Sequence, residues 1–158
     1  MTFQARKSTN INRSIEQVWP HLAETERELQ WRSPYVLSLE VLDDGPVRVG
    51  SRVRGTTRIA GSTQSYVNEV TELTPPRRYA WRGVEVTGPV NGFGSYELEP
   101  TADGGTRVTL DLTYIPQGLM GRLQMPALRW FAPRILRRFL IQLDEVVRAE
   151  VPSREVES

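Results

Sequence analysis

The amino-acid sequence of 158 residues predicts an α+β fold, with a seven-stranded, curved antiparallel sheet wrapped around a long C-terminal helix and two short helices between strands 1 and 2. Three observations predict this architecture. Polar and apolar residues alternate with a period of two through most of residues 3–114, which is typical of half-buried strands. Turn sequences such as Asp103-Gly104-Gly105 join neighbouring strands as hairpins. After Gly118 the apolar residues follow a helical spacing instead.

The length of the chain fits one domain with a sizeable core. We therefore expect residues 1–150 to form a single domain and the polar residues 151–158 to form a disordered tail. A sheet that is polar on one face must cover its other face, and only the terminal helix is long enough to do so. A curved sheet around a single helix leaves space between them, so an internal pocket is expected.

A strand at residues 3–11 is followed by two short helices. Ser14 and Gln17 have the S-x-x-Q spacing of a capping box, which predicts the start of the first helix. Thr25 and Glu28 have the equivalent spacing and predict a second capping box at the start of the second helix. The two helices are therefore expected to be separate elements.

Pro20 explains the interruption between these helices, because it lacks a backbone donor and should kink or end the first helix within a turn. Each short helix carries one tryptophan near its C-terminal end, Trp19 in the first and Trp31 in the second. Both side chains are expected to point toward the same core. His21, directly after Pro20, is expected to be partly exposed at the surface.

Six further strands are predicted by alternation and by the turn signals between them. They are expected at residues 35–42, 51–59, 64–73, 77–84, 93–100 and 106–114. In the last of them, Val108, Leu110, Leu112 and Tyr114 share one face. Gly61-Ser62 is expected to form the tight turn of one hairpin.

The terminal helix is predicted from Leu119 to about Ala149. Its apolar stripe consists of Leu128, Ile135, Phe139, Leu143 and Val146. Pro126 and Pro133 lie in the first half, so the helix is expected to be bent or split there.

Composition disfavours several classes of function. The chain has no cysteine, so it has neither a disulfide nor a thiolate nucleophile. A single histidine and scattered acids give neither the spacing of metal ligands nor a serine-histidine-acid triad. No glycine-rich phosphate-binding motif occurs. We therefore expect no metal and no cofactor.

The net charge and the hydropathy of the chain restrict the partners and the location that we expect for it. The net charge of +1 argues against a nucleic-acid partner. The N-terminal residues have no apolar signal region, and no stretch approaches the ~20 apolar residues of a membrane span. A cytoplasmic location is therefore expected.

Four stretches carry a resemblance to a known family through their order and spacing. They are INRSIEQVWPHLAETERELQW at residues 11–31, VGSRV at 49–53, VTELTPPRRYAW at 70–81 and YELEPTADGGTRVTLDLTY at 96–114. Together they resemble the START / polyketide-cyclase superfamily (SRPBCC), over roughly residues 3–149. In that family a strand leads into a helix that ends in a Val-Trp pair, as at Val18 and Trp19.

The resemblance implies a helix-grip fold with a deep hydrophobic cavity between the sheet and the C-terminal helix. It implies that members bind lipids, sterols, polyketides, hormones or other apolar molecules, while a minority catalyse cyclisation, dehydration or hydrolysis. By analogy with the family, Trp19 is expected to be a core anchor at the helix–sheet junction. Trp31 is expected to lie where the cavity opens.

The candidate ligand-binding residues are mainly aromatic side chains at inward positions. Tyrosine offers apolar area and one polar group, which suits a mostly apolar ligand with a few oxygen atoms. The alternative interpretation is that these side chains simply fill the core. The candidates are Trp31, Tyr66, Asn68, Trp81, Phe93, Tyr96, Tyr114, Met125 and Leu128. No catalytic residue is predicted.

Three functions are compatible with these observations. The first is binding of a hydrophobic or aromatic small molecule in the cavity, and the second is a polyketide cyclase, aromatase or dehydratase reaction in the same place. The third is an interaction module at a membrane surface or on a protein partner. For a membrane, Arg134, Arg137 and Arg138 would contact anionic headgroups, while the proline-containing half of the helix acts as a gate. The sequence carries no signal for the oligomeric state.

Overall fold

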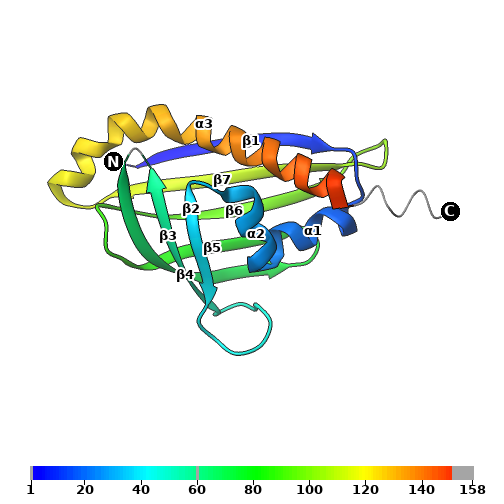
Figure 1. Ribbon diagram of the computed structural model, residues 1–158, viewed down its shortest axis with the longest axis horizontal. Coiled ribbons are helices and arrows are strands. Elements are labelled where there is room, and N and C mark those ends of the chain that lie inside the picture. Colours follow the sequence, from blue (N-terminus) through cyan, green and yellow to red (C-terminus); the bar gives the residue numbers. More distant parts are fainter. Residues whose placement is uncertain (1, 60, 151–158) are drawn as a thin grey trace.

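The strands and helices follow the predicted order in the computed structural model, which describes residues 2–59 and 61–150 (Figure 1). The strands are β1 (Phe3–Ile11), β2 (Val36–Val41), β3 (Arg52–Ile59), β4 (Ser62–Thr74), β5 (Arg78–Val86), β6 (Val90–Pro100) and β7 (Thr106–Pro116). The helices are α1 (Ile15–Ala23), α2 (Thr25–Arg32) and α3 (Gly118–Glu150). The predicted tail at 151–158 lies outside the described residues.

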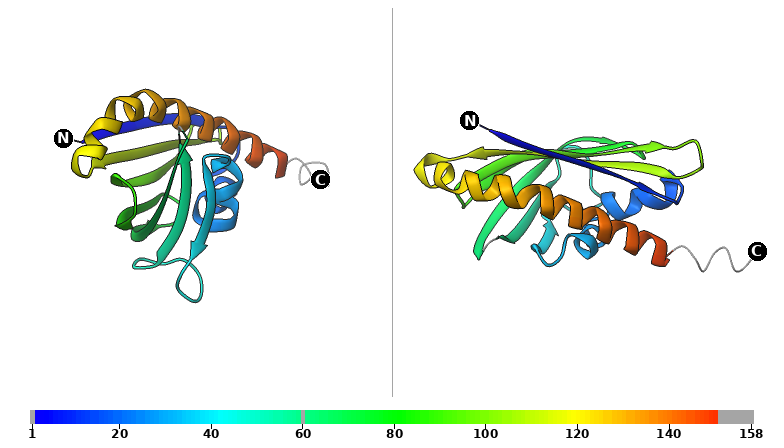
Figure 2. Two further views of the ribbon diagram at one scale, coloured as in Figure 1. Left: turned by 60° about the vertical axis from the view of Figure 1, so that its left-hand side comes forward. Right: turned by 90° about the horizontal axis from the view of Figure 1, so that it is seen from above.

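The seven strands form one antiparallel sheet with the order β1-β7-β6-β5-β4-β3-β2. The sheet curves around α3, which runs along β1 and β7, while α2 packs on β2 and on α3 (Figures 1 and 2). This arrangement confirms the predicted helix-grip fold. In the part of the chain that the structure describes, no helix is both long enough and apolar enough to cross a bilayer.

The caps of the two short helices confirm one prediction and correct another. Gln17 N donates to Ser14 Oγ (3.3 Å) and Ser14 N donates to Gln17 Oε1 (3.0 Å), which completes the predicted capping box of α1. The second predicted capping box, at Thr25 and Glu28, is wrong. Glu24 ends α1 and is also the N-cap of α2, without a side-chain cap bond. No extended residue remains at Thr25, because the chain turns directly from one helix into the next.

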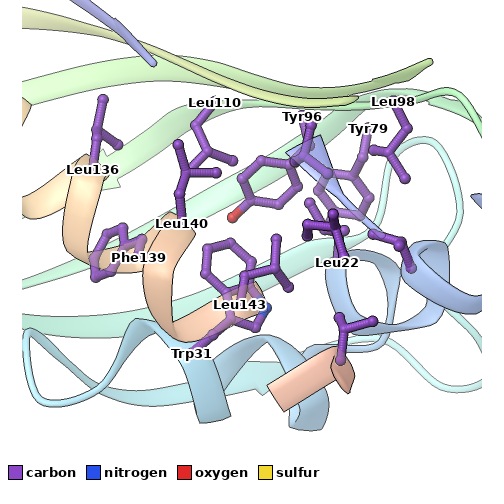
Figure 3. Close-up of a cluster of buried hydrophobic side chains, with 14 of the residues drawn as sticks. Leu22, Trp31, Tyr79, Tyr96, Leu98, Leu110, Leu136, Phe139, Leu140 and Leu143 are labelled. Carbon is purple, nitrogen blue, oxygen red and sulfur yellow. The ribbon is translucent and has the colours of Figure 1, made fainter. Parts of the chain in front are cut away.

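Trp31 anchors the core, contrary to the prediction that it lies where the cavity opens. Its side chain is fully buried, and its indole Nε1 donates a hydrogen bond to the backbone oxygen of His21 (2.7 Å). Its ring meets those of Tyr96 and Phe139 edge-on, with centroids 5.6 Å and 6.0 Å away (Figure 3). Trp31 therefore joins α1, α2, β6 and α3 at one point.

Trp19 has the more peripheral position, so its prediction as the core anchor is also wrong. The buried stripe of α1 consists of Ile15, Val18 and Leu22, together with His21. Trp19 lies at the edge of that stripe and is only partly buried against the core.

His21 is buried rather than partly exposed, which corrects a further prediction. Only 1% of it is accessible, and its Nε2 lies 3.1 Å from Glu150 Oε2 at the end of α3. Burial lowers the pKa of His21 despite the opposing influence of Glu150, so the imidazole is neutral at neutral pH. Arg27 Nη1 lies 2.8 Å from the other carboxylate oxygen of Glu150. The end of α3 thereby contacts both short helices.

Helix α3 is one continuous helix, although Pro126 and Pro133 lie inside it. Figure 2 shows that it follows a curved path, so it is bent and not split. Residues on both sides of each proline, including Met125, Ala132 and Ile135, are buried and hold the helix against the sheet. Tertiary packing therefore compensates for the backbone hydrogen bonds that the prolines cannot make.

We predict that replacing Trp31 with alanine lowers the free energy of unfolding by ~3–5 kcal/mol, as for other large aromatic truncations in a core. Trp19→Ala should cost clearly less, because that side chain is already partly exposed. Urea unfolding of both variants, followed by circular dichroism, measures the difference. Equal losses would show that the two tryptophans contribute alike to the core.

Candidate functional site

A cavity of about 370 Å³ lies between α3 and the sheet. Side chains from α2, α3 and strands β2 to β7 line it. Its walls are mainly apolar, with Trp81 on β5, Leu112 on β7, and Leu128, Phe131 and Phe139 on α3. A volume of this size and an apolar lining are typical of small-molecule sites.

The cavity opens to solvent beside the first half of α3. Three of its lining residues are exposed: Ser62 at the start of β4, Phe93 on β6 and Ala127 on α3. Phe93 is 49% exposed, which is unusual for a phenylalanine next to a hydrophobic cavity. With this exposure, Phe93 does not fill the core.

Two glycines make room for the aromatic walls. Gly55 lies opposite Tyr66 in the β3–β4 register, and a Cβ at this position would collide with the Tyr66 ring. A Cβ on Gly94 would lie 2.7 Å from Cζ2 of Trp81 and would also collide with Leu112. The absence of these two side chains lets Tyr66 and Trp81 lie over neighbouring strands.

The polar groups of the cavity include Tyr66, Asn68, Tyr114 and Gln64. Gln64 Nε2 donates to the backbone oxygen of Val90 (2.8 Å), which connects β4 to the start of β6. Burial raises the pKa of Tyr66, and it raises the pKa of Tyr114 to about 12. Both phenols are therefore neutral at neutral pH and can donate a hydrogen bond to a ligand.

Arg32, the last residue of α2, is the one charged side chain among the described residues that line the cavity. Its Nη1 donates to Glu28 Oε2 (3.0 Å) and to Tyr96 Oη (3.2 Å), while the Tyr96 hydroxyl donates to the same Glu28 oxygen. Its guanidinium carbon lies 5.3 Å from the centre of the Phe139 ring. Burial alone would lower the pKa of Arg32, but Tyr96 and Glu28 outweigh it and the group stays charged.

Six of the nine predicted site residues line the cavity: Tyr66, Asn68, Trp81, Phe93, Tyr114 and Leu128. The other three do not. Trp31 and Tyr96 lie in the buried core, where the Tyr96 hydroxyl contacts Glu28. Met125 is buried elsewhere, because Gln124, Leu128 and Phe131 form the helix face toward the cavity and Met125 is turned about 100° away from Gln124.

The sequence prediction missed Arg32 and the lining residues Tyr35, Phe131 and Phe139. The Glu28–Arg32 spacing of four residues indicates an ion pair on a helix, so the pair was detectable in the sequence. Its position beside a cavity was not, because that depends on how α2 packs against β6 and α3.

The site has the groups for binding and for hydrogen-bond donation. His21 lies at the α1–α3 contact and is absent from the cavity lining. Within residues 2–59 and 61–150, no group of three or more His, Asp or Glu side chains is arranged to hold a metal ion. A ligand would therefore meet apolar walls, neutral phenols, side-chain amides and one guanidinium.

Comparison with known proteins gives one family match. The model of the family described as "Polyketide cyclase / dehydrase and lipid transport" matches residues 2–148. No curated protein sequence is similar enough to this chain to count as a match.

Several solved structures share the fold. The chain is similar to TTHA0849 from Thermus thermophilus, with 24% identity, a TM-score of 0.77, and coverage of 94% of this chain and 99% of that one. It is similar to the Zhui aromatase/cyclase from Streptomyces sp. R1128, with 17% identity, a TM-score of 0.78 and 96% coverage of both chains. A START superfamily protein from Mycobacterium smegmatis gives 16% identity, a TM-score of 0.75, and coverage of 92% and 97%. At these identities the likeness concerns the fold.

We predict that Gly55→Ala lowers the free energy of unfolding by about 1–3 kcal/mol, because the new methyl group displaces the Tyr66 ring. In a Tyr66→Ala background the same change should be neutral or stabilising, since alanine is favoured over glycine inside a strand by about 0.5–1 kcal/mol. Urea unfolding of the four proteins gives the coupling energy between the two positions. If Gly55→Ala has the same cost in both backgrounds, the Tyr66 ring does not lie over Gly55.

Proposed function

The chain belongs to the polyketide cyclase / dehydrase and lipid transport family, and we propose that it binds a hydrophobic or aromatic small molecule, lipid-like or polyketide-like, between the sheet and α3. The observation that carries this proposal is the cavity of about 370 Å³ with its apolar and aromatic walls. Trp81, Leu128 and Phe131 would contact the apolar body of the ligand. Tyr66, Asn68 and Tyr114 would contact its oxygen atoms.

The apolar walls supply the main driving force for binding. At ~25 cal/mol per Å², a ligand that buries ~300 Å² of apolar surface gains ~7.5 kcal/mol before the cost of lost ligand freedom. Hydrogen bonds from the phenols would add specificity.

A cyclase or dehydratase reaction in the same cavity is a second candidate. The neutral phenols of Tyr66 and Tyr114 support it, because a phenol can act as a proton donor in such a reaction. No carboxylate or imidazole from the described residues lines the cavity to accept a proton. For this reason we rank binding above catalysis.

Contact with an anionic membrane is a third candidate, and the outer side of α3 supports it. Four large apolar side chains in its first half are strongly exposed: Leu119 (72%), Met120 (59%), Leu123 (64%) and Trp130 (55%). Arg134, Arg137 and Arg138 follow on the next turns, and the described residues place no carboxylate within ion-pair distance of them. We call these seven residues the α3 outer surface. Because the first half of α3 also borders the cavity opening, membrane contact would bring the opening close to lipid.

The cavity proposal predicts that Leu128→Trp weakens the binding of an apolar fluorescent probe such as 1-aminoanthracene, because the larger ring occupies the cavity. Ile141→Trp is the matched control, since Ile141 lies on the same helix, is 51% exposed and does not line the cavity. Fluorescence titration of the three folded proteins gives the dissociation constants. Equal affinity in all three would mean that the probe binds outside this cavity.

The membrane proposal predicts that the protein co-sediments with anionic vesicles and not with neutral ones, and that added salt weakens the contact. The triple change Arg134→Gln, Arg137→Gln and Arg138→Gln should reduce this binding strongly. The matched control removes three exposed arginines of β3, with Arg52→Gln, Arg54→Gln and Arg58→Gln. Absence of wild-type binding at low salt, or an equal loss in the control, would contradict a role for the α3 outer surface.

A further inference from the structure

Among the described residues, one positively charged side chain and no negatively charged one lines the cavity. Arg32 is the only charged residue of the described chain that lines it, and the remaining polar lining groups are neutral. The charge of Arg32 acts on the pKa values of both Tyr66 and Tyr114, which are cavity residues on β4 and β7. A molecule inside the cavity would therefore be exposed to the field of this guanidinium.

The bonds that hold Arg32 use only part of its donor capacity. A guanidinium presents five N–H donors in a planar fork. Both hydrogen bonds of Arg32, to Glu28 Oε2 and to Tyr96 Oη, use Nη1. The Nε atom is buried and has no hydrogen-bond partner among the described residues. The edge of the fork formed by Nε and Nη2 is therefore not used by either contact.

A buried donor without a partner is unfavourable by about 1–3 kcal/mol, so an unpaired Arg32 Nε calls for a physical reason. If Arg32 served only to join α2 to β6, its ion pair with Glu28 and its bond to Tyr96 would satisfy that role. These two contacts leave the Nε donor unpaired. A second acceptor, supplied by a ligand, would use donors that Glu28 and Tyr96 leave free.

We infer that the molecule bound in the cavity carries a single carboxylate, which pairs with the guanidinium of Arg32 while its apolar body contacts Trp81 and Phe131. The inference rests on the proposed function and specifies its ligand class as a hydrophobic or aromatic carboxylic acid. A carboxylate compensates the charge of a guanidinium and accepts charge-assisted hydrogen bonds from it, which a neutral carbonyl or alcohol does less strongly.

Glu28 sets the strength of this site. Glu28 is 7% exposed and does not line the cavity, and its carboxylate accepts from both Arg32 and Tyr96. It therefore compensates part of the Arg32 charge from the side away from the ligand. Glu28→Gln keeps the shape of this side chain and removes its charge, so a ligand carboxylate should bind more tightly in that variant.

The test compares two fluorescent probes of nearly equal shape, anthracene-9-carboxylic acid and 9-anthracenemethanol, at pH 7.5. Wild-type protein should bind the acid at least about tenfold more tightly than the alcohol. Arg32→Gln should abolish this preference by weakening the acid and leaving the alcohol within about threefold of wild type. Glu28→Gln should increase the preference. Arg107→Gln, which removes an exposed arginine on β7, serves as the charge control.

The outcomes separate this inference from the proposed function. Wild-type protein that binds both probes equally would overturn the inference and leave cavity binding intact. Wild-type protein that binds neither probe would contradict the proposed function itself. If Arg32→Gln does not fold, the test rests on the wild-type preference for the acid and on its expected increase in Glu28→Gln. A preference that is unchanged or smaller in Glu28→Gln overturns the inference. A loss in Arg107→Gln equal to that in Arg32→Gln would mean that only net charge matters.

Discussion

A single helix has to cover the inner face of a seven-stranded sheet that is wider than the helix. The rest of the structure depends on this difference in width. Strands lie ~4.8 Å apart and a helix with its side chains is ~10 Å wide, so α3 cannot reach every strand. It packs along β1 and β7, where Ala5, Leu110 and Leu136 are closely buried. Toward β4 and β5 the curved sheet moves away from the helix, and large side chains such as Trp81 and Phe131 only partly bridge the gap. The cavity is the space that remains.

Helix α2 closes the other end of this space and uses two consecutive residues for different purposes. Trp31 fills the core between the helices and donates its indole hydrogen bond to α1. Arg32, the next residue, lines the cavity and is held by Glu28 and Tyr96. Because both depend on the same helix position, core packing and the polarity of the cavity are linked. A change that moves α2 would alter the stability of the fold and the position of the only charged cavity residue in the described chain.

Local patterns in the sequence were sufficient to predict the elements, because alternation, turn residues and the capping box of α1 act over a few positions. They predicted six residues that line the cavity, and for Tyr66, Trp81 and Tyr114 the side-chain direction follows from the alternation along a strand. These local patterns gave wrong predictions where contacts between residues distant in the sequence determine the position of a side chain. The core position of Trp31, the peripheral position of Trp19, the burial of His21 against Glu150, and the position of Arg32 each depend on how α1, α2 and α3 pack together. Thr25 failed as a cap because Glu24, the C-cap of α1, is also the N-cap of α2.

The proposed function requires an apolar, accessible cavity between α3 and the β4–β5 side of the sheet. A crystal of the protein under xenon pressure tests it directly, because xenon enters apolar cavities and gives strong electron density. We expect xenon in contact with Trp81, Leu128 and Phe131. Side chains of α3 packed directly on β4 and β5, with xenon found only at the surface, would contradict it.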